Sequence, residues 1–230
     1  MKYSDIVKME FSYSDFLDAI KHARKEQFED NLRNRNEFVA FDSKVRGYLG
    51  EIYLRKMFQS NSIEVLKIDY EAKGIETDID FIIKNKKKET LIVECKTSLV
   101  PDSYLTLNNS LNKCDIKIIR REKHYTNIPI DIHVQIYYDL LRNVRDSMLL
   151  SIAGPVSKYT DDEIIEVLRL KEVSGYFVAW IDKNSLNEYL EKLPMYNRIW
   201  KYGFRTFWKC PLHIAKSPLE LIEFLTNKNT

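Results

Sequence analysis

Glycine and proline are scarce in this chain, with six of each among 230 residues, and only three cysteines occur. So few turn-forming residues exclude a collagen-like or low-complexity chain. The cysteines, at positions 95, 114 and 210, show none of the short Cys or His spacings of a disulfide framework or a structural zinc site. Cysteine usage therefore predicts a reducing compartment, and we expect a cytoplasmic protein.

Long apolar runs are also lacking. None approaches the roughly 18 to 20 residues of a membrane span, and the acidic residues Asp5, Glu10 and Asp15 are unlike a signal peptide. We therefore expect no membrane partner. Neither charge is in excess, because 36 Lys and Arg against 34 Asp and Glu leave a net charge of +2. Binding to a polyanion would have to depend on local clusters of basic residues.

Apolar residues make up 44% of the chain and aromatic residues 12%, which predicts a packed α or α/β protein. Apolar residues at helical spacing predict helices from Ser12 onward, over 37–59, over 161–170 and from Ser217 onward. In the second helix, Gly47 and Gly50 would allow another element to pack closely.

Runs rich in β-branched and aromatic residues predict strands at 63–70, 79–84, 90–97, 130–138 and 176–181. The second and third of these are joined by a short basic loop and predict an antiparallel hairpin, whereas 103–124 is mixed and reads as a helix and a turn. The chain is interpreted as a single domain over 1–230. Its parts are a core at about 37–181, a helical extension at 1–36 and a C-terminal strand and helix at 196–227.

The tripeptide acid-x-Lys occurs at four places and by itself carries little information. Only Glu94-Cys95-Lys96 ends an apolar strand, LIVECK, that follows another strand bearing carboxylates, TDIDFII. If the apolar faces of both strands enter the core, the register pairs Asp80 with Glu94 and Asp78 with Lys96. Two carboxylates at this separation repel each other unless a cation lies between them.

Hard oxygen ligands suit Mg²⁺, which also accepts water and phosphate oxygens. A lysine beside such a site, here Lys96, would stabilise the charge that develops during phosphodiester hydrolysis. A simpler interpretation stays open at this stage. Asp80 and Glu94 are also compatible with solvated edge carboxylates, and Asp78 with Lys96 is compatible with an ordinary cross-strand ion pair.

The arrangement resembles the PD-(D/E)XK nuclease superfamily, in which an acid on the second strand precedes Glu-x-Lys on the third. Asp80 and Glu94-Cys95-Lys96 match these elements, and Gly47-Tyr48-Leu49-Gly50-Glu51 matches the G-x-x-G-E context of the preceding helix in many members. The resemblance covers about residues 44 to 140. The usual proline before the acid is missing, since Thr77 precedes Asp78, so the choice between Asp78 and Asp80 as principal ligand stays open.

The resemblance implies an α/β fold with a restriction-endonuclease-like core, which is a central mixed β-sheet flanked by helices. It also implies a Mg²⁺-dependent DNA endonuclease of the restriction or defence type, in which Mn²⁺ can substitute and a homodimer is one arrangement. The implied metal ligands are Asp80, Glu94 and Glu51, and Lys96 completes the catalytic set. Asp78 and Gln135 are candidate accessory residues, although a satisfied core or edge glutamine is the favoured interpretation of Gln135.

Other functions fit the same residues. A structure-specific repair or recombination nuclease is one alternative, and a catalytically idle copy of the fold that serves in binding or assembly is another. His133 shares a strand face with Gln135, but the histidines lack ligand spacing, which argues against a histidine-dependent mechanism.

Basic residues that would follow the catalytic strand are candidate phosphate contacts: Lys117, Arg120, Arg121 and Lys123. The tail from Arg198 to Lys209 alternates rings and basic residues. This alternation fits either a nucleic-acid surface or a half-buried strand with a basic outer face.

Overall fold

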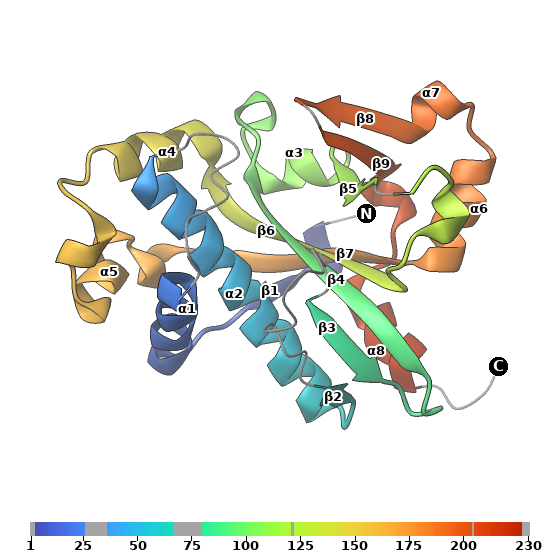
Figure 1. Ribbon diagram of the computed structural model, residues 1–230, viewed down its shortest axis with the longest axis horizontal. Helices are drawn as coiled ribbons and strands as arrows, with labels where there is room; N and C mark the ends of the chain where they lie inside the picture. The colour runs from blue at the N-terminus through green and yellow to red at the C-terminus, as the bar shows by residue number, and fades with distance from the viewer. Residues whose placement is uncertain (1–2, 26–35, 67–79, 121, 204, 227–230) are drawn as a thin grey trace.

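A central six-stranded sheet organises the molecule (Figure 1). The computed structural model describes residues 3–25, 36–66, 80–120, 122–203 and 205–226. The strand order is β1-β7-β6-β4-β3-β2, with β4 and β6 parallel and every other neighbouring pair antiparallel. The strands are β1 (Val7–Met9), β2 (Glu64–Leu66), β3 (Phe81–Lys84), β4 (Thr90–Val100), β6 (Ile132–Leu141) and β7 (Gly175–Asp182).

A second, three-stranded antiparallel sheet lies beside the first in the order β5-β9-β8. Its strands are β5 (Asp115–Ile119), β8 (Ile199–Tyr202) and β9 (Arg205–Pro211). It joins the middle of the chain to its C-terminal part and lies at the opposite end of the molecule from α1 and α5 (Figure 1).

Several helices begin at a capping residue, whose hydrogen bonds satisfy backbone groups of the first turn. The Ser12 backbone N–H donates to the Asp15 carboxylate at 2.8 Å, and Asn36 accepts from the Phe38 N–H at 2.9 Å. Thr160 and Glu163 form a complete capping box. The longer helices are α1 (Tyr13–Lys25), α2 (Glu37–Ser60), α4 (Arg142–Leu150), α5 (Asp161–Val167), α6 (Lys183–Glu191) and α8 (Pro218–Thr226). The short helices are α3 (Leu107–Leu111) and α7 (Met195–Arg198).

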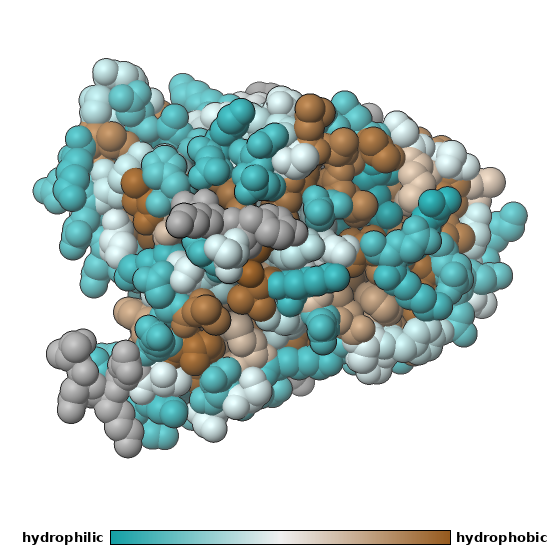
Figure 2. Space-filling view, turned by 180° about the vertical axis from the view of Figure 1, so that it is seen from behind, coloured by the Kyte–Doolittle hydropathy of each residue, from teal (hydrophilic) through white to brown (hydrophobic). Residues whose placement is uncertain are grey.

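Two hydrophobic cores hold these layers together. The larger core joins α1, α2, α4, α5 and α8 to the six-stranded sheet, with Leu49, Val93 and Ile136 among its fully buried residues. The second core joins α3, α6 and the small sheet to β6 and β7, and Trp208 lies within it. Alternate residues of β4 and β6 therefore point into different cores. Seen from the side opposite Figure 1, hydrophilic surface surrounds separate hydrophobic patches (Figure 2).

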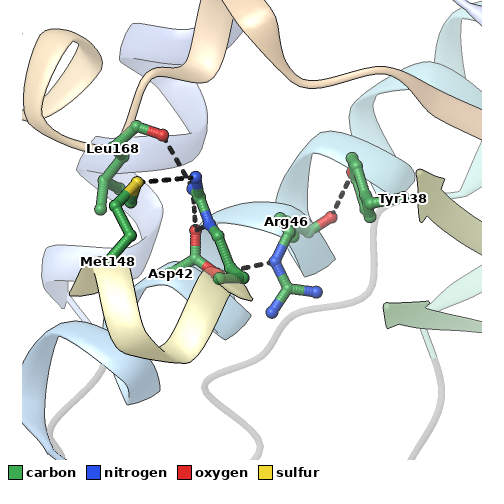
Figure 3. Close-up of polar contacts among 6 residues, drawn as sticks. Asp42, Arg46, Tyr138, Met148 and Leu168 are labelled. Atoms are coloured by element: carbon green, nitrogen blue, oxygen red, sulfur yellow. Dashed lines mark hydrogen bonds and ion pairs between the residues drawn. The ribbon is translucent and has the colours of Figure 1, made fainter. Parts of the chain in front are cut away.

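A buried ion cluster ties α2 to α4 (Figure 3). We call Asp42, Arg46 and Arg145 the Asp42 cluster. The Asp42 carboxylate lies 2.8 Å from the Arg46 Nε and 2.5 Å from the Arg145 Nη2, which also donates to the Leu168 carbonyl at 2.8 Å. Burial by itself would raise the pKa of Asp42, but the two guanidinium groups outweigh it and lower that pKa.

The coarse fold class predicted from the sequence is confirmed: the protein is α/β, with a mixed sheet flanked by helices. Three strands of the described chain were not predicted, and one of them arises because the single strand expected within 196–227 is two strands, β8 and β9. β5 lies within the 103–124 segment interpreted as a helix and a turn, and β1 lies within the N-terminal extension and pairs with β7. In the described part of the chain, no helix is long and apolar enough to cross a bilayer.

Candidate active site

The β3–β4 hairpin has the predicted register, since Phe81 pairs with Val93 and Lys84 with Thr90. Asp80 and Glu94 are the next residues along the two strands, and the Asp80 N–H donates to the Val93 carbonyl at 3.2 Å. The ladder ends at this point, where the Asp80 Oδ2 accepts the Cys95 N–H at 2.5 Å. Asp80 is therefore held against β4 by its side chain. Asp78 lies outside the described residues.

Glu94 is fully buried and has two basic neighbours. Its Oε1 lies 2.7 Å from the Lys96 Nζ, and its Oε2 lies 2.7 Å from the His133 Nδ1. An ionised carboxylate only accepts hydrogen bonds, so the His133 Nδ1 is the donor. Burial by itself would raise the pKa of Glu94, but the His133 hydrogen bond and the positive charge of Lys96 lower it. Glu94, Lys96 and His133 are called the Glu94 cluster below.

Two groups of the Glu94 cluster, the Lys96 ammonium and the His133 Nε2, retain the capacity for further contacts. The Lys96 side chain is 32% exposed, so its ammonium connects the buried carboxylate to the surface. The His133 side chain is 2% exposed, and its Nε2 has no hydrogen-bond partner among the residues that the structure describes. His133 was not among the predicted site residues, because its contact with Glu94 depends on the parallel pairing of β4 with β6, in which Glu94 aligns with His133.

Gln135 aligns with Lys96 in the same parallel pairing. Its Nε2 donates to the Lys96 carbonyl at 3.1 Å, to the Ser98 Oγ at 3.2 Å and to the Ile136 carbonyl at 3.0 Å. With only 3% of its surface exposed, Gln135 fits the alternative of a satisfied core glutamine. It holds the backbone of β4 at Lys96.

Glu51 lies on α2, which packs against the Val93 and Cys95 face of the sheet, the face opposite Glu94. Gly50 lies so close to this face that an added Cβ would be 3.0 Å from both Thr97 Cγ2 and Ile136 Cδ1, as the sequence predicted for a close helix contact. No heavy atom of the described chain lies within 4 Å of a Cβ built on Gly47, so that part of the prediction is wrong. Glu51 follows this contact and lines a small hollow with His22, Tyr48, Ile52 and Arg55.

Burial raises the pKa of the Cys95 thiol well above its ordinary value, and the charges of Asp80 and Glu51 raise it further. The Asp80 and Glu51 carboxylates are therefore both near enough to Cys95 to disfavour its thiolate form. Among the described residues, however, no three His, Cys, Asp or Glu side chains are grouped closely enough to hold a metal ion together. Of the predicted ligands, Asp80 and Glu94 are the two that lie next to the last pair of the β3–β4 ladder, and the Asp80 carboxylate bonds the residue after Glu94.

The chemistry of this pair fits a hard divalent cation. Mg²⁺ needs only one or two protein carboxylates when water and substrate phosphates complete its shell. Each carboxylate oxygen has two lone pairs, so the contacts of Glu94 with Lys96 and His133 leave acceptor capacity on both of its oxygens. Asp80 is half-buried, which gives the pair an opening toward solvent.

Among the described residues predicted to bind phosphate, Lys117 and Arg120 do not share one surface. Lys117 lies on the outer face of β5, with its Nζ 3.9 Å from the centre of the Trp200 ring. Arg120 packs over Trp208 instead and donates to the Lys123 carbonyl at 3.2 Å. Lys123 is exposed, and Arg121 lies outside the described residues.

No protein-family model, curated protein or solved structure matches the chain.

Proposed function

We propose that the protein is a Mg²⁺-dependent endonuclease that hydrolyses phosphodiester bonds in DNA, with a restriction-endonuclease-like core and a role in restriction or defence. The observation that supports this proposal is the hairpin register: its last pair, Phe81 with Val93, is followed by Asp80 on one strand and by Glu94 on the other, where Lys96 is ion-paired to the Glu94 carboxylate. Mn²⁺ is expected to substitute for Mg²⁺ because both accept carboxylate oxygens. A cytoplasmic location and a homodimer stay predictions.

In this proposal, Asp80 and Glu94 hold the metal, which on binding would polarise the phosphate and make a bound water more acidic. Glu94 stays ionised because the His133 hydrogen bond and the Lys96 charge favour its carboxylate form. The Lys96 ammonium lies at the surface of the site, where it stabilises negative charge on the reacting phosphate. Gln135 keeps the Lys96 backbone in place.

The test compares two site variants with a matched control whose side chain also bonds the backbone of β4. Asp131 resembles Asp80, because its Oδ2 accepts a β4 backbone N–H, that of Ile92, at 2.8 Å. Asp80→Asn and Glu94→Gln should each cut plasmid DNA at least about a hundredfold more slowly in Mg²⁺. Asp131→Asn should cut at the wild-type rate. If a folded Asp80→Asn or Glu94→Gln variant matches the wild type, the site assignment is wrong.

A catalytically idle binding module is the second candidate. Glu94 has two basic neighbours without any metal, so the acid does not by itself require a catalytic role. Incubating the wild type with plasmid, a four-way junction, single-stranded DNA and RNA, each with Mg²⁺, Mn²⁺ or EDTA, separates the candidates. Metal-dependent cutting of plasmid supports the proposal, preferential cutting of the junction supports a repair nuclease, and binding without any cutting supports the idle module.

A further inference from the structure

The small sheet has two chemically different faces. The inner face is apolar and buried, and its register places Ile118 and Ile199 beside Trp208. Because side chains alternate along a strand, the residues between them form the outer face. We call this surface the β5-β9-β8 outer face, and it consists of Asp115, Lys117, Ile119, Trp200, Tyr202, Arg205, Phe207, Lys209 and Pro211, so that it carries one acid beside its three basic residues.

Like charges are paired across this outer face. Lys117 lies directly opposite Lys209 in the β5–β9 register, a placement that destabilises a sheet when nothing neutralises it. Burial lowers the pKa of Lys117, and the positive charges of Arg142 and Lys209 lower it further, although Asp115 opposes them. Arg205 adds an exposed cation on the same face. The electrostatics therefore favour an anionic partner.

Aromatic rings lie beside these cations. The Trp200 and Tyr202 rings are nearly parallel, with centroids 5.4 Å apart and 12° between their planes, and Phe207 lies 5.3 Å from Trp200. Tyr202 is 51% exposed. The Lys117 ammonium lies 3.9 Å from the centre of the Trp200 ring, which places a cation within one side-chain length of the ring cluster.

Rings next to cations match the two parts of a nucleotide. A base stacks on an aromatic side chain, and the phosphate that follows it contacts a lysine or arginine. A duplex hides the faces of its bases, so this surface fits a single strand. We propose that the β5-β9-β8 outer face binds single-stranded nucleic acid, with bases stacking on Tyr202 and Trp200 and phosphates contacting Lys117, Lys209 and Arg205.

This site goes beyond the proposed cleavage activity and does not depend on it. Binding is measured by fluorescence anisotropy in EDTA, where metal-dependent cutting cannot occur, with labelled thymidine and uridine oligomers and a blunt duplex of mixed sequence. The thymidine and uridine arms distinguish DNA from RNA as the natural strand. Tighter binding of either single strand than of the duplex is expected, and a duplex that binds at least as tightly as both would overturn the proposal.

Two pairs of variants test the stacking and phosphate contacts separately. Tyr202→Ala should weaken single-strand binding at least about fivefold, the lower end for one stacked base, whereas Tyr13→Ala should leave it unchanged. Tyr13 is a matched control because it is 48% exposed and lies on α1 at the other end of the molecule (Figure 1). Lys209→Gln should reduce the dependence of log affinity on log salt by about 0.7, and the exposed Lys158→Gln should not.

Tryptophan fluorescence reports on the face directly. Trp180 and Trp208 are buried, so quenching by an unlabelled thymidine or uridine oligomer should come from Trp200. The conservative variant Trp200→Phe should lose this quenching while it keeps most of its affinity. The proposal fails if Tyr202→Ala binds like the wild type or if Trp200→Phe quenches as the wild type does.

Discussion

Asp42 and Glu94 are both fully buried acids with two basic neighbours. Their clusters differ in how far the basic neighbours are buried and hydrogen-bonded: we call the Asp42 cluster closed and the Glu94 cluster open. The arginines around Asp42 are themselves buried, with 6% and 4% of their surfaces exposed, and Arg145 also bonds the Leu168 carbonyl. Glu94 has instead a lysine that is one-third exposed and a histidine whose second ring nitrogen has no partner in the described part of the chain.

The difference separates a structural cluster from a candidate site. Guanidinium groups are planar, always charged and matched to a carboxylate, so they fix the helices that carry them. An ammonium is a point charge on a flexible stem, and it can turn toward a phosphate. A buried nitrogen without a partner costs about 1–3 kcal/mol. The Glu94 cluster is thus compensated electrostatically but retains unused bonding capacity, which is typical of functional sites.

The largest expected effect is on stability, at the closed cluster. Asp42→Ala leaves two buried arginines without their acid and should lower the free energy of unfolding by about 3–5 kcal/mol, measured in urea. Asp182→Ala is the control, because the Lys216 partner of Asp182 is 35% exposed. Removing this half-open pair and the helix cap that Asp182 provides should cost about 1–2 kcal/mol. Equal losses would contradict the division into closed and open clusters.

The next effect is on catalysis, at the open cluster. Lys96→Ala should bind DNA nearly normally but cut it about a hundredfold more slowly in single-turnover assays with saturating enzyme, a loss of about 2.7 kcal/mol in transition-state stabilisation. Lys216→Ala is closely matched, since the Lys216 Nζ also lies 2.7 Å from a carboxylate, and it should cut normally. Wild-type cutting by Lys96→Ala at saturation would limit Lys96 to substrate binding.

A smaller effect is expected at His133, which positions Glu94 without reaching the surface. His133→Phe removes the donor to Glu94 and should lower cleavage about tenfold at limiting Mg²⁺, with less effect at saturating Mg²⁺. His133→Asn keeps an N–H donor near the same place and should recover most of the rate. A uniform loss at all Mg²⁺ concentrations, or no rescue by Asn, would indicate that His133 acts only in packing.

The hairpin was predictable from sequence because its information is local. Alternating apolar residues set which face is buried, and the short loop sets the register, so the pairing of Phe81 with Val93 followed from the chain itself. The common face of Glu94 and Lys96 followed as well, because the two residues alternate with Cys95 along one strand, and the structure adds an ion pair between them.

The remaining features depend on pairings between distant segments. His133 meets Glu94 only because β6 lies parallel to β4, and nothing near His133 in the sequence specifies that partner. β5 is short and mixed in composition, and it becomes a strand by pairing with β9 near the C-terminus. Its alternation then separates Lys117 from Arg120, which the sequence reasoning had grouped as one phosphate-binding cluster.

The smallest expected effect is the response of the two buried acids to pH. Folding lowers the pKa of both Asp42 and Glu94, so below about pH 4 the unfolded chain binds protons that the folded chain does not. Their contribution to stability is therefore present above this range and is lost as the pH falls through the folded pKa values. Each carboxyl contributes at most about 1.4 kcal/mol per pH unit.

Urea unfolding between pH 6 and pH 3 tests this response in the wild type, Asp42→Asn and Glu94→Gln. Both variants should lose stability less steeply than the wild type in the acid range, because each lacks one of these titrating groups. The change should be larger for Asp42→Asn, since both arginines stay buried and charged at every pH. Lys96, by contrast, is already partly solvated beside Glu94. Identical slopes for all three proteins would mean that other carboxyls control acid unfolding.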